Sequence, residues 1–205
     1  MVISAKKQQV NLSARYSISG VGLCVVQYRG DVVVGLQLSD GGSFEGSGSL
    51  VDGFEGSDSF VEGSEGLGSL TDGSEGLGSL VDGSGFLDGA RCRLSDDLFR
   101  QVLEYFAGER LVFDVRFEIE GVTQFQRQVL EELQRIPYGE QRSYRAVAEA
   151  VESPRAARAV GGACNRNPLH LIVPCHRVVG AGGALTGFAA GVAIKRKLLE
   201  AESIV

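Results

Sequence analysis

Several features that define common protein classes are missing from this 205-residue chain. No apolar run approaches the ~20 residues that a bilayer-spanning helix needs, and the N-terminus lacks a signal-peptide pattern. The four cysteines are widely spaced and do not suggest a disulfide framework; they are Cys24, Cys92, Cys164 and Cys175. There is no CxxC pair, and the N-terminal half has no histidine, so no metal site is predicted. These absences favour a cytoplasmic protein.

Basic residues are also missing from one long stretch. Residues 40–89 contain 11 acidic residues and no basic ones, although the formal net charge of the chain is only -6. Residues 121–205 contain 11 basic and 7 acidic residues, a net charge of +4. The acidic charge is therefore separated from a segment that could bind DNA phosphates with moderate, salt-sensitive affinity.

The acidic stretch is a ten-residue repeat rich in glycine and serine. Its related units include Gly53-Phe54-Glu55-Gly56, Gly63-Ser64-Glu65-Gly66 and Gly73-Ser74-Glu75-Gly76. So few apolar residues cannot offset the entropy of ordering the backbone, and residues 40–89 are predicted to be a disordered insertion in a surface loop. A stacked β-solenoid and a calcium-binding repeat are the alternatives, but the units are few and the aspartate spacing differs from the nonapeptide calcium repeat.

The residues on either side of this repeat predict an N-terminal α+β domain made of residues 1–39 and 90–120. β-Branched runs predict a hairpin with Cys24 in its core, and a further strand is expected nearby. Ser95 is the expected N-cap of a helix that ends at Gly108. The expected strands cover residues 15–19, 22–28 and 31–38, and residues 110–120 form an extended link.

Residues 121–205 predict a second, mostly helical domain. Thr123, Ser143 and Ser153 are expected N-caps. Helices are predicted over residues 124–135, 144–151, 155–163 and 191–202. The second and third of these would form a helix-turn-helix, so the expected fold class is α+β with a winged-helix-like C-terminal domain. In the last helix, Lys195, Arg196 and Lys197 are interpreted as a solvated face.

A cysteine and a histidine are adjacent in an aliphatic stretch, residues 171–179, that is predicted to be extended. A free thiol has a pKa near ~8.5, so Cys175 needs a neighbouring base or cation to react at neutral pH, and His176 and Arg177 follow it directly. A buried structural cysteine is the alternative. A cysteine hydrolase would need another histidine across a cleft, but His170 is predicted to lie on the surface.

Several short motifs occur in one order along the C-terminal segment. They are Ile136-Pro137-Tyr138-Gly139-Glu140, Ser143-Tyr144, the run from Arg155 to Ala163, Asn165-Arg166-Asn167-Pro168, Pro174-Cys175-His176-Arg177-Val178 and Leu185-Thr186-Gly187-Phe188. In this order they resemble the O6-alkylguanine-DNA alkyltransferases, whose acceptor-cysteine motif matches the residues around Cys175. The resemblance runs from about Thr123 to Glu202, and more weakly over the helix near Ser95.

The resemblance implies DNA repair by direct reversal of damage. Cys175 would irreversibly accept the alkyl group of O6-alkylguanine, and of O4-alkylthymine, in double-stranded DNA. Each molecule would act once and without a cofactor, as a monomer in the cytoplasm that associates with the nucleoid or enters the nucleus when on DNA. A protein that only binds and flags lesions is the alternative, and the presence of the cysteine counts against it.

The resemblance also assigns the catalytic residues, which are Cys175, His176, Glu202, Asn167 and Tyr144. His176 would reach the thiol through a water molecule, because neighbouring residues of a strand point to opposite faces. Glu202, rather than Glu200, would orient the imidazole. Asn167 would be a hinge between the DNA-binding helix and the active-site loop, and Tyr144 would donate a hydrogen bond to the purine.

A second set of residues is implied to bind DNA in the minor groove. Arg158 would fill the space left by a flipped nucleotide. Ala157 and Gly161 would let the backbone approach closely, and Arg155 and Arg166 would add positive charge. An alanine-rich helix that simply packs on its neighbour is the alternative.

The pocket for the flipped base is expected to include Val178, Gly183, Phe188 and Ala189. Phe188 and Ala189 stand where many relatives have tyrosine and serine, so fewer donors are expected near O6. Together with Ala190, they could form an apolar wall for alkyl groups larger than methyl.

Overall fold

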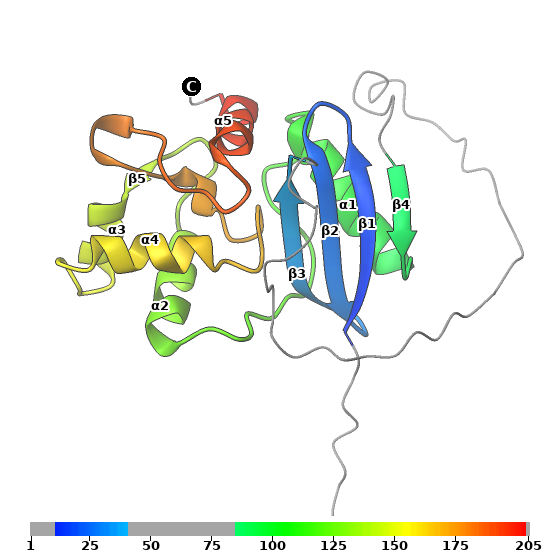
Figure 1. Ribbon diagram of the computed structural model, residues 1–205, viewed down its shortest axis with the longest axis horizontal. Coiled ribbons are helices and arrows are strands. Elements are labelled where there is room, and N and C mark those ends of the chain that lie inside the picture. The colour runs from blue at the N-terminus through cyan, green and yellow to red at the C-terminus, as the bar shows by residue number, and fades with distance from the viewer. Residues whose placement is uncertain (1–10, 41–84, 204–205) are drawn as a thin grey trace, which may run out of the picture.

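The computed structural model describes residues 11–40 and 85–203 (Figure 1). The N-terminal half is a four-stranded sheet with one helix, α1, packed on one face, and the C-terminal half contains the helices α2 to α5. This arrangement agrees with the expected α+β class. Most of the predicted repeat insertion lies outside the described residues.

The sheet consists of β1 (Leu12–Ile18), β2 (Gly22–Arg29), β3 (Val32–Ser39) and β4 (Gly85–Gly89). The strand order is β3-β2-β1-β4, and neighbouring strands are antiparallel. Side chains alternate between the two faces of each strand, which buries Tyr16, Cys24 and Val26 against α1. The predicted hairpin and the core position of Cys24 are confirmed.

Strand β4 corrects one prediction. Residues 85–89 were assigned to the disordered insertion, but they pair with β1 along the edge that β2 leaves free. Gly89 ends this strand with φ 102°, and a Cβ atom there would lie 2.4 Å from the Ser13 carbonyl oxygen. The close approach of the two strands therefore requires glycine at this position.

Helix α1 (Arg93–Phe106) begins earlier than predicted. Its N-cap is Cys92 rather than Ser95. Ser95 lies inside the first turn, where its hydroxyl accepts a hydrogen bond from the Cys92 backbone N–H over 3.0 Å. The helix packs on the sheet through a stacked pair, Tyr16 and Phe99, whose ring centroids are 4.3 Å apart.

The C-terminal helices are α2 (Gln124–Leu133), α3 (Tyr144–Ala150), α4 (Ala157–Asn165) and α5 (Val192–Ala201). Thr123 and Ser143 cap α2 and α3 as predicted, since each hydroxyl accepts a backbone N–H of the first turn. Helix α4 starts two residues later than predicted, because Ser153 to Ala156 form a separate turn. Within residues 11–40 and 85–203, no helix has the length and apolar character needed to cross a membrane.

The segment around Cys175 is not the extended strand that its aliphatic residues predicted. Cys175–Arg177 form one 3-10 turn, η1, in which the Arg177 N–H donates to the Pro174 carbonyl over 3.0 Å. Only Val178–Val179 form a strand, β6, which pairs in parallel with β5 (Arg142–Ser143). A second 3-10 turn, η2 (Ala181–Gly183), follows. Alternating strand geometry therefore does not separate the side chains of Cys175 and His176.

The two halves of the chain meet where residues 168–170 lie along β3. The Leu36 N–H donates to the Pro168 carbonyl, and the His170 N–H donates to the Leu36 carbonyl. The prediction that His170 lies on the surface is wrong: it is 3% exposed, and its Nδ1 accepts from the Leu38 N–H over 3.1 Å. The edge of β3 that faces away from β2 has buried backbone groups that need partners, and residues 168–170 supply them at Leu36.

We expect His170 to make stability depend on pH. Burial, with a smaller effect of the neighbouring His176, lowers the pKa of His170 to about 4. Between about pH 6.5 and 4 the unfolded chain binds a proton that the folded protein does not bind, so stability falls as pH falls. The loss should reach about 3 kcal/mol. Urea unfolding at several pH values measures it.

The matched variant is His170→Gln, which keeps an acceptor for the Leu38 N–H but does not titrate. Its unfolding free energy should depend less on pH between 6.5 and 4 than that of the unmodified protein. Equal slopes for the two proteins in this window would contradict the assignment.

Candidate active site

The thiol of Cys175 is buried at the start of η1, with 1% of the residue exposed. Asn167, two residues after the end of α4, donates from Nδ2 to the thiol sulfur over 3.1 Å and to the Val173 carbonyl over 2.8 Å. Burial raises the pKa of Cys175 to about 11, against the opposing effects of Asn167 and the charge of Lys195. Asn167 thus links the end of α4 directly to the thiol.

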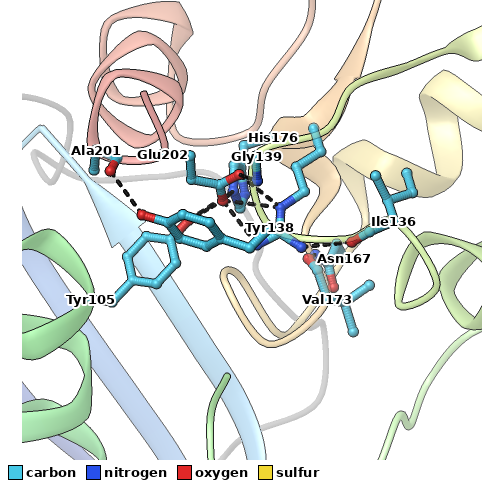
Figure 2. Close-up of polar contacts among 10 residues, drawn as sticks. Tyr105, Ile136, Tyr138, Gly139, Asn167, Val173, His176, Ala201 and Glu202 are labelled. Atoms are coloured by element: carbon cyan, nitrogen blue, oxygen red, sulfur yellow. Dashed lines mark hydrogen bonds and ion pairs between the residues drawn. The ribbon is translucent and has the colours of Figure 1, made fainter. Parts of the chain in front are cut away.

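His176 and Glu202 form a completely buried pair. His176 Nε2 lies 2.7 Å from Glu202 Oε1, and neither side chain is exposed (Figure 2). A carboxylate only accepts hydrogen bonds, so Nε2 carries a hydrogen and Nδ1 has the free lone pair when the ring is neutral. Among the described residues, Nδ1 has no hydrogen-bond partner. Burial lowers the pKa of His176, although Glu202 opposes this effect.

The carboxylate of Glu202 accepts hydrogen bonds from three parts of the chain: α1, the turn after α2, and η1. Arg177 Nε donates to both oxygens at 2.9 and 3.0 Å, and the Gly139 N–H donates to Oε2 at 3.0 Å. The Tyr105 hydroxyl also donates to Oε1. Burial by itself would raise the pKa of Glu202, but hydrogen bonds from His176 and Arg177 outweigh it and lower the pKa to about 2. Arg177 therefore pairs with Glu202, not with the thiol.

Lys195 corrects the interpretation of a solvated face on the last helix. Arg196 and Lys197 are exposed as expected, but Lys195 is 0% exposed. Its Nζ donates to the Val178 carbonyl over 2.5 Å and to the Thr186 carbonyl over 3.0 Å. Burial lowers the pKa of Lys195, and the thiols of Cys175 and Cys164 oppose this effect. Its spacing from the buried Leu198 and Leu199 was the sequence signal that places it on the inner face.

A hollow of about 480 Å³ opens beside α4, lined by Tyr144, Ala157, Arg158, Gly161, Asn165, Thr186 and Gly187. The Tyr144 hydroxyl lies 3.0 Å from the Thr186 carbonyl and 3.1 Å from the Gly187 carbonyl. Burial raises the pKa of Tyr144 to about 12, so its hydroxyl stays protonated at neutral pH. The hollow thus brings together Tyr144 and three of the five residues predicted to bind DNA.

Arg155 and Arg166, the other two residues of that set, are exposed and do not line this hollow. The four residues predicted to form the base pocket do not line it either; they are Val178, Gly183, Phe188 and Ala189. Phe188 is buried against the His170 ring, with ring centroids 5.3 Å apart, whereas Ala189 is exposed. The two therefore do not form one wall of this hollow, and their role in base binding stays a prediction.

Tyr105, Lys195 and Asn165 belong to the site but were not predicted. Tyr105 comes from α1 in the other half of the chain, 71 positions before His176, so no local pattern points to it. Among the described residues, no three His, Cys, Asp or Glu side chains are grouped so that they could hold a metal ion.

This chain is similar in sequence to one family of DNA-repair methyltransferases. Residues 124–204 match the family model for the DNA-binding domain of 6-O-methylguanine DNA methyltransferase. A Methanosarcina acetivorans methylated-DNA–protein-cysteine methyltransferase is 54% identical over 103 residues, which span 50% of this chain and 65% of that protein. A Methanosarcina mazei protein of the same name is 51% identical over 112 residues, 53% of this chain and 70% of that protein.

The similarity extends to solved structures. The crystal structure of Mycobacterium tuberculosis OGT in complex with DNA aligns with 91% of this chain and 91% of its own, with a TM-score of 0.61 and 32% identity. Because 91% of this chain aligns, the structural likeness includes the N-terminal sheet, which lies outside the residues matched by the family model.

We expect Glu202→Gln to destabilise the protein by about 3–5 kcal/mol, because it leaves Arg177 as a buried charge without its counter-ion. Glu200→Gln on the same helix is the control, since Glu200 is exposed, and it should change stability by less than about 0.5 kcal/mol. Urea unfolding at pH 7 measures both.

The pH dependence of the Glu202 effect follows from its lowered pKa of about 2. The carboxylate stabilises the fold fully above the unfolded pKa of about 4.5 and loses this effect as pH falls towards 2. The difference between Glu202→Gln and the unmodified protein should therefore shrink below pH 4.5. Equal effects of the Glu200 and Glu202 variants at pH 7 would refute the buried ion pair.

Proposed function

Because this chain belongs to the family of methylated-DNA–protein-cysteine methyltransferases, we propose that it repairs DNA by moving the alkyl group of O6-alkylguanine onto Cys175. One observation carries the proposal: a buried thiol lies next in the chain to a buried histidine–carboxylate pair, and Asn167 ties it to the end of α4. The same transfer is proposed for O4-alkylthymine as a second substrate.

In the proposed reaction the sulfur of Cys175 bonds to the alkyl carbon while the bond between that carbon and guanine O6 breaks. The thiol proton ends on the departing guanine, so atoms and charge balance without a cofactor. The product is a thioether, which is not readily cleaved. Each protein molecule therefore acts once and ends in an alkylated form.

His176 is the proposed base. A buried nitrogen without a protein partner is a site where water commonly supplies the hydrogen bond, and a water between Nδ1 and the thiol would carry the proton. The lowered pKa of His176 keeps the ring neutral near pH 7, as a base requires. Glu202 holds the ring, and the charge of Lys195 favours the thiolate.

Tyr144 is the proposed donor to the purine. Its hydroxyl lies at the edge of the hollow beside α4, held by the Thr186 and Gly187 carbonyls. A base that enters the hollow would offer an acceptor in place of these carbonyls. The predicted pocket residues Val178, Gly183, Phe188 and Ala189 remain part of the proposal as the surroundings of the base.

DNA would bind through α3 and α4, proposed here as the helix-turn-helix of a winged-helix-like domain over residues 121–205. Arg155, Arg158 and Arg166 are exposed along or beside α4 and can meet phosphates or bases. The small side chains of Ala157 and Gly161 allow close approach in the minor groove. Arg158 lines the hollow and is the proposed substitute for the flipped nucleotide.

The remaining features of the proposal concern the whole protein. It would act as a monomer on double-stranded DNA that contains alkylated guanine, in the cytoplasm and on the nucleoid or in the nucleus. Residues 1–39 and 85–120 would form the N-terminal domain, because β4 belongs to its sheet.

A restriction site that contains one O6-methylguanine tests this function. The lesion blocks cleavage, and incubation with the protein should restore it until the cleavable DNA equals the protein in moles. Cys175→Ser should restore no cleavage yet still bind the duplex. Cys164→Ser is the matched control, because Cys164 is another buried cysteine of the C-terminal half, and it should repair as the unmodified protein does.

Two outcomes would count against the proposal. Binding of the methylated duplex without any restored cleavage would favour the lesion-binding alternative. Restored cleavage by Cys175→Ser would show that another group accepts the alkyl.

A further inference from the structure

Tyr105 reaches the centre of the site from the opposite half of the chain. It lies near the C-terminal end of α1, and the residue is 0% exposed. Figure 2 shows its side chain directed at the carboxylate of Glu202, beside His176. The other groups that contact this carboxylate come from residues 139–202. Tyr105 is thus the contribution of the N-terminal half to the proposed proton path.

The hydroxyl of Tyr105 makes two contacts at once. It donates its hydrogen to Glu202 Oε1, and its oxygen lies 3.1 Å from His176 Nε2. Nε2 also lies 2.7 Å from the same carboxylate oxygen. The three polar atoms therefore form a closed group in which each lies within hydrogen-bond distance of the other two.

Only one arrangement of hydrogens satisfies this group. The tyrosine hydroxyl has one hydrogen, which goes to the carboxylate, so its oxygen can only accept from Nε2. A hydrogen on Nε2 can then be shared by Glu202 and Tyr105. With the hydrogen on Nδ1 instead, the lone pair of Nε2 would face two oxygen acceptors.

We propose that Tyr105 is a positioning residue that fixes the Glu202 carboxylate and holds His176 with its hydrogen on Nε2, so that Nδ1 remains the base for Cys175. The role in alkyl transfer rests on the proposed function. The hydrogen-bond arrangement itself does not depend on it.

Packing alone does not explain the hydroxyl. The Tyr105 ring lies among the aromatic rings of Phe106, Phe113 and Tyr138, with centroid distances of 6.0, 5.6 and 5.9 Å. A phenylalanine would make the same ring contacts. Burial, and then the charge of Glu202, raise the pKa of Tyr105, so the hydroxyl is a neutral donor at neutral pH.

The charged groups around His176 set the direction of the expected effect. They are Glu202 at the end of α5, Arg177 in η1 and Lys195 on α5. Glu202 favours the charged ring, and the two cations oppose it. His170, in the segment along β3, is neutral near pH 7 because its pKa is lowered to about 4. Removal of the Tyr105 hydroxyl leaves more negative charge on Oε1 for His176, so the pKa of His176 should rise.

NMR of protein with 15N-labelled histidine tests the arrangement without DNA, because the chain contains only two histidines. His170→Gln assigns the two rings. In the unmodified protein at neutral pH, His176 should show a protonated Nε2 and a bare Nδ1. A hydrogen on Nδ1 would overturn the proposal, and this result needs no Tyr105 variant to fold.

Tyr105→Phe should move the titration of His176 to higher pH. Tyr138→Phe is the matched control, because the Tyr138 hydroxyl donates to the Ala201 carbonyl and not to the carboxylate. It should leave the titration of His176 unchanged. An unchanged titration in Tyr105→Phe would also overturn the proposal.

Single-turnover transfer from O6-methylguanine DNA tests the role in chemistry. Tyr105→Phe should slow transfer about tenfold, a part of the roughly 10²–10⁴-fold effect of a general base. Its DNA affinity should be unchanged, and the acid side of its pH–rate profile should move to higher pH.

A lower melting temperature with an unchanged pH–rate profile would show a structural role only. No transfer by the unmodified protein would count against the proposed function, while NMR would still decide the role of Tyr105.

Discussion

The buried carboxylate of Glu202 is the interaction on which the rest of the site depends. An isolated carboxylate could not remain charged in a dry interior, but this one accepts hydrogen bonds from His176, Arg177, Tyr105 and the Gly139 backbone. These donors belong to η1, α1 and the turn after α2, and Glu202 itself ends α5. One charge therefore joins four segments that lie far apart in the sequence, and the orientation of the His176 ring follows from where they meet.

The thiol beside this cluster is buried as well, which raises its pKa and makes spontaneous ionisation unfavourable. Two features offset this effect. Asn167 donates a hydrogen bond to the sulfur. The ammonium group of Lys195, which donates to the Val178 and Thr186 carbonyls, supplies a positive charge. Asn167 also follows α4, the helix that lines the hollow described above. A single side chain thus connects the end of α4 to the sulfur.

Patterns within one element could be predicted from the sequence. The caps at Thr123 and Ser143 and the hairpin around Cys24 follow from local signals. The pairing of Glu202 with His176, which joins two elements, was implied by the family resemblance. Predictions failed where distant parts of the chain decide the outcome. β4 forms because β1 offers a free edge. His170 is buried against the edge of β3. Lys195 is buried because it donates hydrogen bonds to the carbonyls of Val178 and Thr186. Tyr105 could not be found, because nothing near it in the sequence relates it to His176.

Cys175 is the proposed acceptor of the alkyl group. The most direct measurement is the intact mass of the protein after incubation with duplex DNA that carries O6-methylguanine, followed by peptide mapping. If Cys175 is the acceptor, each molecule should gain one methyl group, located on the peptide that contains Cys175. No gain in mass, or a methyl group on Cys164 or another residue, would contradict this assignment.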